Sequence, residues 1–280
     1  MNNIIDGKAS SIKIKEELKT YVDSLDEKPG LVVIQVGDNP ASNTYVKNKK
    51  LAAEYIGINF FHYKYEENTS EEELINKIKE LNNDNSVDGI IVQLPLPKGF
   101  NETKIINYID PNKDVDGLTE LNAGKLVNNE DCLSSCTPTG IMKLLEMYNV
   151  EIEGKNTVVV GRSILVGKPI ATMLLNKNAT VTICHSKTKN LKEITKNADI
   201  LVVATGHINT ITEDMVNENA VVIDVGINRN EENKLCGDVD FNTIKDKVKL
   251  ITPVPGGVGP MTVAMLNYNV IKSYKKRRGI

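Results

Sequence analysis

The sequence has 280 residues, of which 40% are hydrophobic and 25% are charged, a composition typical of globular proteins and not of disordered chains. Its formal net charge of −3 gives no electrostatic reason to expect nucleic acid as a partner. The four cysteines, Cys132, Cys136, Cys184 and Cys236, lack the histidine or second close pair of a zinc site, so we expect reduced thiols and no metal.

The N-terminus and the hydropathy pattern predict a cytoplasmic protein. Residues 1–7 do not show the basic start and apolar core of a signal peptide. No apolar run approaches the length of a membrane span. The basic run Lys275–Arg278 is interpreted as a solvated helix C-terminus, where positive charges suit the helix dipole, in preference to a binding surface.

The first half of the chain alternates strands with helices. Leu31–Val36 and Gly89–Leu94 are short apolar runs that predict buried strands. Helices are predicted over Ser42–Tyr55 and over Ser70–Leu81, with Ser70 as the N-cap of the second. This order predicts a parallel sheet with right-handed crossovers.

A second alternating series follows a helix that we expect to begin at Thr137-Pro138 and to run to about Tyr148. Helices are predicted from about Lys168 and near Leu191, and a last one from about Pro260 to Arg277. Four short apolar runs predict the strands of the series, namely Thr157–Val160, Thr180–Cys184, Ile200–Ala204 and Val221–Val225. Strands and helices in this order are typical of a dinucleotide-binding fold.

The segment Gly161–Pro169 (GRSILVGKP) follows the first strand of that series and opens a helix. Glycines let the backbone approach a phosphate, and a helix N-terminus offers free N–H groups to it. The spacing departs from the usual G-x-G-x-x-G pattern, so an ordinary strand-to-helix turn explains this segment equally well.

The end of the next strand predicts which dinucleotide is bound. NAD-binding folds place a carboxylate there to hold the ribose 2′-hydroxyl, whereas this strand ends Cys184-His185-Ser186-Lys187. A carboxylate would repel a 2′-phosphate, but the Ser186 hydroxyl, nearby cations and the guanidinium of Arg162 would accept one. The pattern therefore favours NADP over NAD, and His185 is given no chemical role.

Tyr45 and Lys49 lie four residues apart on the first predicted helix and so share one face of it. On spacing alone, a solvated lysine beside an amphipathic tyrosine is the simpler interpretation, because Lys47 and Lys50 crowd the same stretch.

Segments along nearly the whole chain carry a family resemblance that changes this interpretation. They are SNTYVKNKK at 42–50, DGIIVQLPLP at 88–97, KDVDGL at 113–118, CTPTG at 136–140, GRSILVG at 161–167, CHSKT at 184–188, VATG at 203–206, DVGIN at 224–228 and ITPVPGGVGPMT at 251–262. Each is modest alone, but together in this order they are specific. The chain resembles the bifunctional methylenetetrahydrofolate dehydrogenase/methenyltetrahydrofolate cyclohydrolases.

The resemblance implies an α/β protein of two domains with a cleft between them. Residues 1–120 would form the catalytic folate-binding domain, on which the C-terminal helix of residues 260–280 packs back. Residues 121–259 would form a Rossmann-type NADP-binding domain with a parallel sheet, through which a homodimer is built. The implied activity is NADP-dependent oxidation of 5,10-methylenetetrahydrofolate to 5,10-methenyltetrahydrofolate, then hydrolysis to 10-formyltetrahydrofolate, which supplies one-carbon metabolism and purine synthesis.

The resemblance also assigns site residues by matching positions. Lys49 matches the catalytic lysine, Tyr45 the tyrosine that packs against the folate, and Gln93 the glutamine that helps set the lysine's protonation. Asp116 matches the carboxylate that holds the pterin, and these four make up the implied catalytic set. Pro255, Gly256 and Gly257 match the loop that closes over the substrate. The implied NADP-binding positions are Gly161, Arg162, Ser163, Ser186 and Ile227, with Arg162 and Ser186 at the 2′-phosphate.

The departures from the family pattern are peripheral. Gly99 stands where many members have histidine, and Ser135 where proline is common. Ile164 takes a position that is lysine in some relatives, which bears on how tightly the phosphates are held. None of these three positions is catalytic.

The cyclohydrolase step places the sharper demand on the site. Water must add to the methenyl carbon, and a proton must then move to break one C–N bond. A free lysine is protonated near neutral pH, so a lysine base must lie in a cleft that disfavours the ammonium. We expect Lys49 to act in this way, oriented by Gln93.

Three alternatives remain open on the sequence. The first is a dehydrogenase with little cyclohydrolase activity. The second is a catalytically idle NADP- or folate-binding module, against which the intact Tyr45, Lys49, Gln93 and Asp116 argue. The third is an unrelated NADP oxidoreductase, such as an amino-acid dehydrogenase, which would not explain the VQLPLP and PGGVGP segments.

Overall fold

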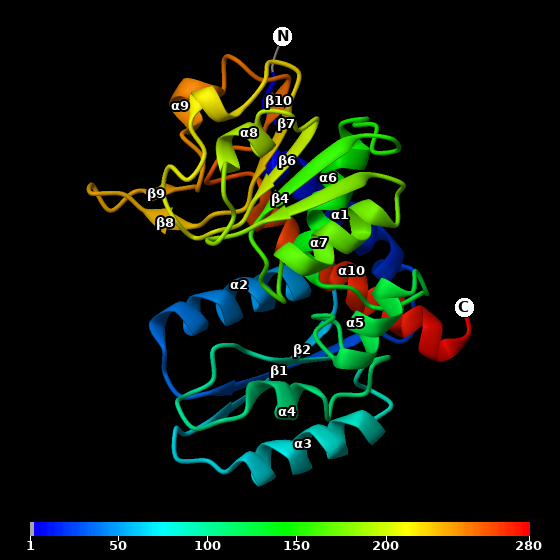
Figure 1. Ribbon diagram of the computed structural model, residues 1–280. Helices are drawn as coiled ribbons and strands as arrows, with labels where there is room; N and C mark the ends of the chain where they lie inside the picture. The colour runs from blue at the N-terminus through cyan, green and yellow to red at the C-terminus, as the bar shows by residue number, and fades with distance from the viewer. Residues whose placement is uncertain (1–2) are drawn as a thin grey trace. The chain divides into compact units, whose positions relative to one another are not determined.

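A computed structural model describes residues 3–280, which fold into two compact units that are each built from parallel strands and helices (Figure 1). Unit 1 comprises Met1–Ser11 and Thr137–Thr262, and unit 2 comprises Ile12–Cys136 and Val263–Ile280. The chain crosses between them three times, each time inside a helix: α1 (Gly7–Asp23), α6 (Cys136–Met147) and α10 (Val258–Arg278).

These units differ from the predicted domains at their edges. The prediction divided the chain at residues 120/121 and 259/260, whereas packing assigns residues 1–11 to unit 1 and residues 121–136 to unit 2. The first difference has a clear cause, since Ile5 N donates to Ile251 O over 2.8 Å and Lys8 N donates to Gly256 O over 2.9 Å. The predicted boundaries stay a prediction about functional domains.

Unit 2 is built on a three-stranded parallel sheet in the order β2-β1-β3. The strands are β1 (Gly30–Val36), β2 (Asn59–Tyr65) and β3 (Gly89–Val92). Strands β1 and β3 are buried along their whole length, which is why they appear as continuous apolar runs in the sequence. The predicted Gly89–Leu94 strand ends two residues early, and β2 was not predicted.

Two helices cover opposite faces of this sheet, α2 (Pro40–Ile56) on one and α3 (Glu71–Asn83) on the other (Figure 1). Alternate residues of β1 pack with the apolar stripe of α3, as a strand period of two requires. The predicted N-cap Ser70 is confirmed, because its hydroxyl accepts a hydrogen bond from Glu73 N. Two short helices complete the unit, α4 (Glu102–Ile106) and α5 (Glu120–Val127).

The basic run at 275–278 is not simply solvated, and this part of the prediction was wrong. The carboxylate of Asp88 is fully buried, and both Arg277 and Arg278 pair with its Oδ1 at 2.7 Å. Burying a carboxylate is costly unless cations and hydrogen bonds satisfy it, and Gly30 N donates to Oδ2 at 2.9 Å. The sequence did not show that a buried acid lies opposite the last turn of α10.

Unit 1 contains a five-stranded parallel sheet in the order β10-β7-β6-β4-β5. Its strands are β4 (Asn156–Val160), β5 (Thr180–Cys184), β6 (Ile200–Val203), β7 (Val221–Asp224) and β10 (Leu250–Ile251). Four of these confirm predicted strands to within one residue at each end. The chain moves from β4 to β5 on one side and then to β6 on the other, so the order reverses between β4 and β6.

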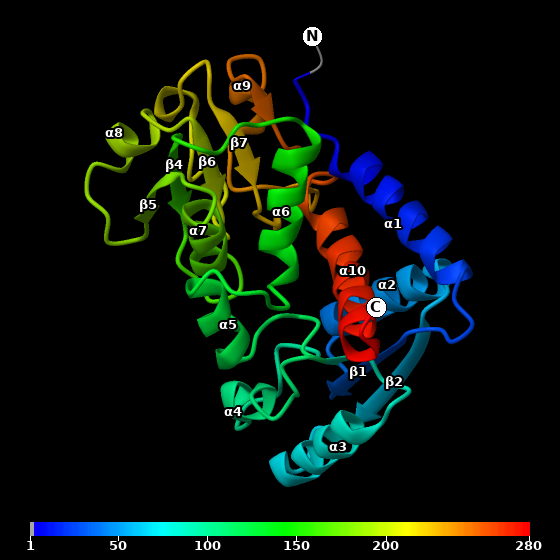
Figure 2. The same cartoon turned by 90° about the vertical axis from the view of Figure 1, so that its right-hand side faces the viewer.

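Helices cover both faces of the unit 1 sheet (Figures 1 and 2). On one face lie α6 and α7 (Gly167–Leu175), and on the other α8 (Leu191–Thr195) and α9 (Phe241–Ile244). Helix α6 begins at Cys136, so Thr137, predicted as its N-cap, lies inside the helix. The remaining elements are a 3-10 turn, η1 (Glu213–Met215), and a hairpin of β8 (Asn228–Arg229) with β9 (Leu235–Cys236).

Three further findings concern the helices, the cysteines and the possible metal ligands of the described residues. Among the described helices, none combines the length and the apolar character needed to span a lipid bilayer. All four cysteines are free thiols, and Cys132, Cys136 and Cys184 are buried. Within residues 3–280 no group of three or more histidine, cysteine, aspartate or glutamate side chains is arranged to hold a metal ion.

Candidate active site

The centre of the candidate site in unit 2 is a contact between Lys49 on α2 and Gln93, the residue that follows β3. Nζ of Lys49 donates a hydrogen bond to Oε1 of Gln93 over 3.0 Å. Nε2 of Gln93 donates to Leu94 O over 2.7 Å, so the amide nitrogen is engaged and the oxygen is turned to the lysine. Gln93 is buried and Lys49 is half-buried, which fixes the pair at the edge of the protein interior.

Tyr45 lies one helical turn before Lys49 on α2, and its side chain is 49% exposed. Helix α2 is capped at both ends, because Asn39 Oδ1 accepts from Ala41 N and Ser42 N and Gly57 ends the helix at a φ of 92°. A well-defined helix holds the ring of Tyr45 and the amine of Lys49 in a constant relation.

Asp116 lies on a turn that its neighbours hold in place. The buried carboxylate of Asp114 accepts from Leu118 N at 3.1 Å, Thr119 N at 2.8 Å and Asn122 Nδ2 at 2.9 Å. Burial nevertheless raises the pKa of Asp114 above its ordinary value. Asp116 itself is half-buried, so Asp114 builds the turn and leaves the second carboxylate available to a ligand.

Lys113 anchors the start of the same turn and was not singled out from the sequence. Its side chain is 1% exposed, and Nζ donates to Leu81 O at 2.8 Å and Asp84 O at 2.7 Å, at the end of α3. Burial, followed by the positive charge of Arg277, lowers the pKa of this amine to about 8. Lysines are seldom fully buried, so no sequence signal indicated this contact.

Both Lys49 and Asp116 influence the buried thiol of Cys136. Burial raises the pKa of the Cys136 thiol well above its ordinary value. The negative charge of Asp116 acts in the same direction, while the positive charge of Lys49 acts in the opposite one. The structure therefore places Lys49 and Gln93 in contact within unit 2, the unit that also holds Asp116.

In unit 1, the turn after β4 is shaped by its two glycines. Gly161 has a φ of 132°, and a Cβ there would lie 2.3 Å from Ala204 O. A Cβ on Gly167 would lie 2.3 Å from Gly161 O. The first glycine thus lets this turn close onto the end of β6, at the point where strand order reverses, which is where ligands bind in open α/β sheets.

The predicted cofactor residues Arg162, Ser163 and Ser186 lie in two turns, one after β4 and one after β5. The Ser163 hydroxyl accepts from Val166 N and Gly167 N, so it caps the start of α7, and Arg162 is exposed. Ser186 is exposed just beyond β5, in a turn that His185 stabilises by accepting from Lys187 N through Nδ1. His185 therefore has a local structural contact.

Two buried aspartates, Asp224 and Asp238, organise the loops at the carboxyl ends of β6 and β7. Asp238 accepts from Thr205 N at 2.6 Å, Gly206 N at 3.0 Å and Asn228 Nδ2 at 2.8 Å. Asp224 accepts from the backbone N–H groups of Gly226, Asp238 and Val239. Burial still raises the pKa of Asp224 to about 6. This network supports the segment from which Ile227 projects with 56% exposure.

Pro255, Gly256 and Gly257 belong to unit 1, and the described contacts of this loop are with the start of α1. Gly256 has a φ of 107°, and its carbonyl accepts from Lys8 N. A Cβ on Gly7 would lie 1.8 Å from Gly257 O, so the two segments approach too closely for any side chain there.

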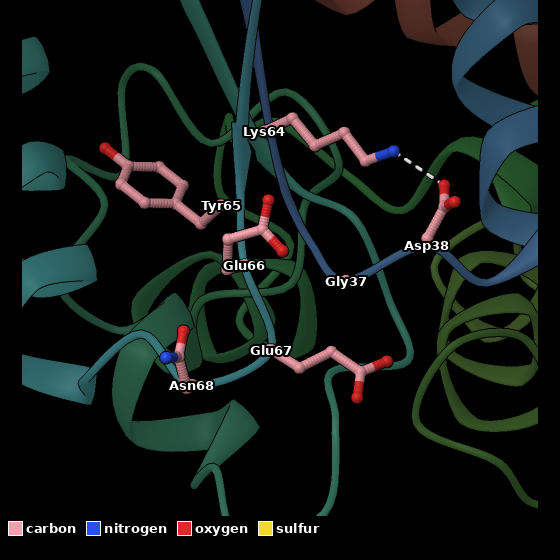
Figure 3. A pocket seen from close by; sticks show the side chains of 7 residues that line it. All are labelled: Gly37, Asp38, Lys64, Tyr65, Glu66, Glu67 and Asn68. Atoms are coloured by element: carbon pink, nitrogen blue, oxygen red, sulfur yellow. Dashed lines mark hydrogen bonds and ion pairs between the residues drawn. The ribbon is translucent and has the colours of Figure 1, made fainter.

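A cavity of about 470 Å³ opens elsewhere in unit 2, at the carboxyl ends of β1 and β2 (Figure 3). It is lined by Gly37, Asp38, Lys64, Tyr65, Glu66, Glu67 and Asn68. Lys64 Nζ and Asp38 Oδ1, both in its lining, form an ion pair at 2.6 Å (Figure 3). None of the predicted site residues lines this cavity.

The fold and the site define the class of two-unit α/β enzymes that bind a dinucleotide in one unit and carry a lysine, an amide and a carboxylate in the other. A family model described as the tetrahydrofolate dehydrogenase/cyclohydrolase catalytic domain matches residues 5–116. A second, described as the NAD(P)-binding domain of the same proteins, matches residues 135–278. The chain belongs to the tetrahydrofolate dehydrogenase/cyclohydrolase family.

Individual relatives agree with this assignment. The bifunctional protein FolD of Campylobacter hominis is 57% identical over 277 residues, which cover 98% of each chain. The crystal structure of the bifunctional FolD enzyme from Campylobacter jejuni has a TM-score of 0.96 at 50% identity and covers 98% of this chain and 99% of its own. The Trypanosoma brucei enzyme, complexed with NADP cofactor and inhibitor, has a TM-score of 0.93 at 36% identity, covering 99% and 98%.

Proposed function

We propose that this protein oxidises 5,10-methylenetetrahydrofolate with NADP to 5,10-methenyltetrahydrofolate and then hydrolyses the product to 10-formyltetrahydrofolate. The observation that carries the proposal is the Lys49–Gln93 contact, with Asp116 in the same region of unit 2. Full-length similarity to bifunctional enzymes supports both activities in one chain.

The residues of unit 1 fit NADP. The close approach of Gly161 to Ala204 leaves a backbone turn that a Cβ would obstruct, as a phosphate-binding turn requires. Strand β5 ends in a segment with an exposed Ser186 and no carboxylate, so a 2′-phosphate would meet no like charge there. We assign Gly161, Arg162, Ser163, Ser186 and Ile227 to NADP, which supplies the hydride acceptor when bound.

Unit 2 would hold the folate. A reduced pterin offers an amino group and a neighbouring ring N–H, and the half-buried carboxylate of Asp116 can accept from both. The exposed ring of Tyr45 offers an apolar face on the same helix as Lys49. Pro255, Gly256 and Gly257 remain assigned to the substrate loop on the resemblance alone.

The dehydrogenase step leaves a positive methenyl carbon between two nitrogens and needs no base. Orientation of the substrate is the chief contribution of the protein to this step. Asp116 and Tyr45 would supply it by fixing the pterin. Loss of a base at position 49 should therefore spare hydride transfer.

The cyclohydrolase step needs proton transfer. Water adds to the methenyl carbon, and the Lys49 amine would take one proton from the added water and pass it to the departing ring nitrogen. The second proton of the water would be released to solvent as the formyl C=O bond forms and one C–N bond breaks. Gln93 suits this role because a neutral amide orients the amine without a negative charge that would hold the proton on it.

The remaining assignments are also proposals. We infer a cytoplasmic enzyme, since its free and mostly buried thiols suit a reducing compartment. We infer a homodimer built through unit 1, which light scattering of the purified protein would test. Folate function is assigned to residues 1–120 with 260–280, and NADP function to residues 121–259.

The deciding experiment mixes the protein with 5,10-methylenetetrahydrofolate and either NADP or NAD, and follows the absorbance of reduced nicotinamide. We expect turnover with NADP well above that with NAD. Separate measurement of methenyl and formyl products then distinguishes a bifunctional enzyme from a dehydrogenase with little cyclohydrolase activity. No turnover with either cofactor would instead favour an idle binding module or a different oxidoreductase.

A further inference from the structure

Helix α10 holds the turn that carries Asp116. The side chain of Asn269 is 2% exposed, and its Nδ2 donates to Val115 O and to Ser134 O, both at 2.9 Å. One amide on α10 therefore joins the residue directly before Asp116 to the segment that precedes α6. Nδ2 also lies 3.7 Å from Cys136 Sγ, so the two N–H donors of this amide are shared among three acceptors.

The Val115 carbonyl is fixed from a second direction. Cys136 Sγ donates to the same oxygen over 3.3 Å. Gly117, on the other side of Asp116, has a φ of 68°, and a Cβ there would lie 2.3 Å from the carbonyl carbon of Ser134. The backbone on both sides of Asp116 thus packs against residues 134–136. The peptide planes on either side of Asp116 set the direction of the Asp116 side chain.

The same stripe of α10 holds the neighbouring backbone. Ser273, four residues after Asn269, is fully buried, and its hydroxyl lies 2.5 Å from Asp88 O and 2.6 Å from Asn112 O, so its single proton is shared between these two carbonyls. Residues four apart share one helix face, so a single face of α10 forms hydrogen bonds with the backbone just before β3 and with the Asp116 turn. Both side chains are neutral, so they position the turn without competing for the charge of Asp116.

We propose that Asn269 is a positioning residue for the folate site, which orients the Asp116 carboxylate toward the N–H groups of the pterin by fixing the Val115 carbonyl. This inference rests on the function proposed above for Asp116. It assigns the α10 side chain a part in substrate recognition at a distance from the substrate itself.

The first test is Asn269→Ala in the full-length enzyme. A displaced carboxylate loses its paired hydrogen bonds to the pterin, so we expect the KM for 5,10-methylenetetrahydrofolate to rise about tenfold. The KM for NADP and the kcat at saturating folate should change less than about twofold. A general structural fault would instead lower kcat or raise both KM values.

A double-mutant cycle with Asp116→Asn separates positioning from bulk stability. If Asn269 acts through Asp116, then Asn269→Ala in the Asp116→Asn background should raise the folate KM less than about twofold further. An effect of the same size in both backgrounds would overturn the proposal. Calorimetric titration with tetrahydrofolate in the absence of NADP gives the Kd of each variant, so that the effect of Asn269→Ala on binding can be compared in the two backgrounds.

Asn267 provides a matched control on the same helix. It is fully buried, but its Nδ2 donates to Val263 O of α10 itself. Asn267→Ala removes a buried amide that has no contact with the Asp116 turn, so we expect an unchanged KM for 5,10-methylenetetrahydrofolate. An equal rise of this KM in Asn267→Ala and Asn269→Ala would also overturn the proposal. Wild-type enzyme that fails to turn over 5,10-methylenetetrahydrofolate would refute the proposed function, whereas additivity in an active enzyme refutes only the role of Asn269.

Discussion

Lys49 and Gln93 are 44 positions apart in the sequence, yet the amine of one lies 3.0 Å from the amide oxygen of the other. The two side chains come from different elements of unit 2, a helix and the end of a strand. The second hydrogen bond of Gln93, to Leu94 O, decides which end of the amide meets the lysine. This orientation gives the amine an acceptor that carries no charge.

Replacing the amine should separate the two activities. Lys49→Met keeps the length and apolar character of the side chain but cannot carry a proton. We expect cyclohydrolase activity to fall at least about 100-fold, as for loss of a general base, while NADP binding persists and hydride transfer continues. Accumulation of the methenyl product measures this directly. Near-normal hydrolysis by the variant would contradict the role of Lys49.

A negative charge at position 93 should also impair hydrolysis. Gln93→Glu keeps the shape of the side chain but places a carboxylate beside Lys49, which favours the ammonium and removes the base. We expect the cyclohydrolase rate at neutral pH to fall about tenfold or more, with dehydrogenase activity changed less. Recovery as the pH is raised would show that the lost species is the neutral amine. A pH-independent loss would point to altered packing.

Cofactor choice should respond to charge at the end of β5. Ser186→Asp places a carboxylate where we assign the 2′-phosphate, and we expect the KM for NADP to rise at least about tenfold while that for NAD does not. Asn190→Asp adds the same charge four residues further on and is the matched control. Equal effects of the two variants would show only a general response to net charge.

The turn after β4 should not tolerate a side chain. Gly161→Ala would bring a Cβ within 2.3 Å of Ala204 O at a φ of 132°, so we expect a loss of about 2 kcal/mol or more in unfolding free energy, together with weaker NADP binding. Gly124 in α5 is the control, because a Cβ there has no atom within 4 Å. Gly124→Ala should be neutral or should stabilise the protein by up to about 1 kcal/mol. Urea unfolding measures both.

The buried carboxyl of Asp224 should make part of the stability pH-dependent. Its pKa is raised in the folded protein from 3.8 to about 6, so the folded state binds a proton more tightly than the unfolded state. This contribution is present below about pH 4 and is lost as the pH rises through about 6. Relative to Asp224→Asn, the wild-type protein should therefore lose unfolding free energy across that window, as urea unfolding at several pH values would show.

Strands and helices with a regular pattern were predictable from the sequence, whereas contacts between distant segments were not. Strands β4, β6 and β7 are short, almost entirely buried runs whose positions follow from hydropathy, whereas β5, at the edge of the sheet, is buried only at Cys184. Strand β2 (NFFHYKY) was missed because, at the edge of its sheet, it has an exposed or half-buried residue at every position. Helix α1 was missed as well, although it extends over 17 residues.

The candidate site shows the same limit. Lys49, Gln93 and Asp116 were assigned by resemblance, and the structure places Lys49 and Gln93 within hydrogen-bond distance of each other. The supporting residues had no comparable signal. A buried lysine at 113 looks like any charged residue in a sequence, and the Asp224–Asp238 network joins loops whose proximity depends on the order of the strands.

The pairing of Asp88 with Arg277 and Arg278 has a consequence for the order of synthesis. Residues 12–136 leave the ribosome early and include Asp88, whose carboxylate is buried in the folded protein. The two arginines that neutralise it are not yet synthesised at that point. All of unit 1 beyond its first eleven residues is translated before those arginines emerge. Domains fold as units during translation, so the segment that emerges first must wait for α10 and is expected to complete its folding last.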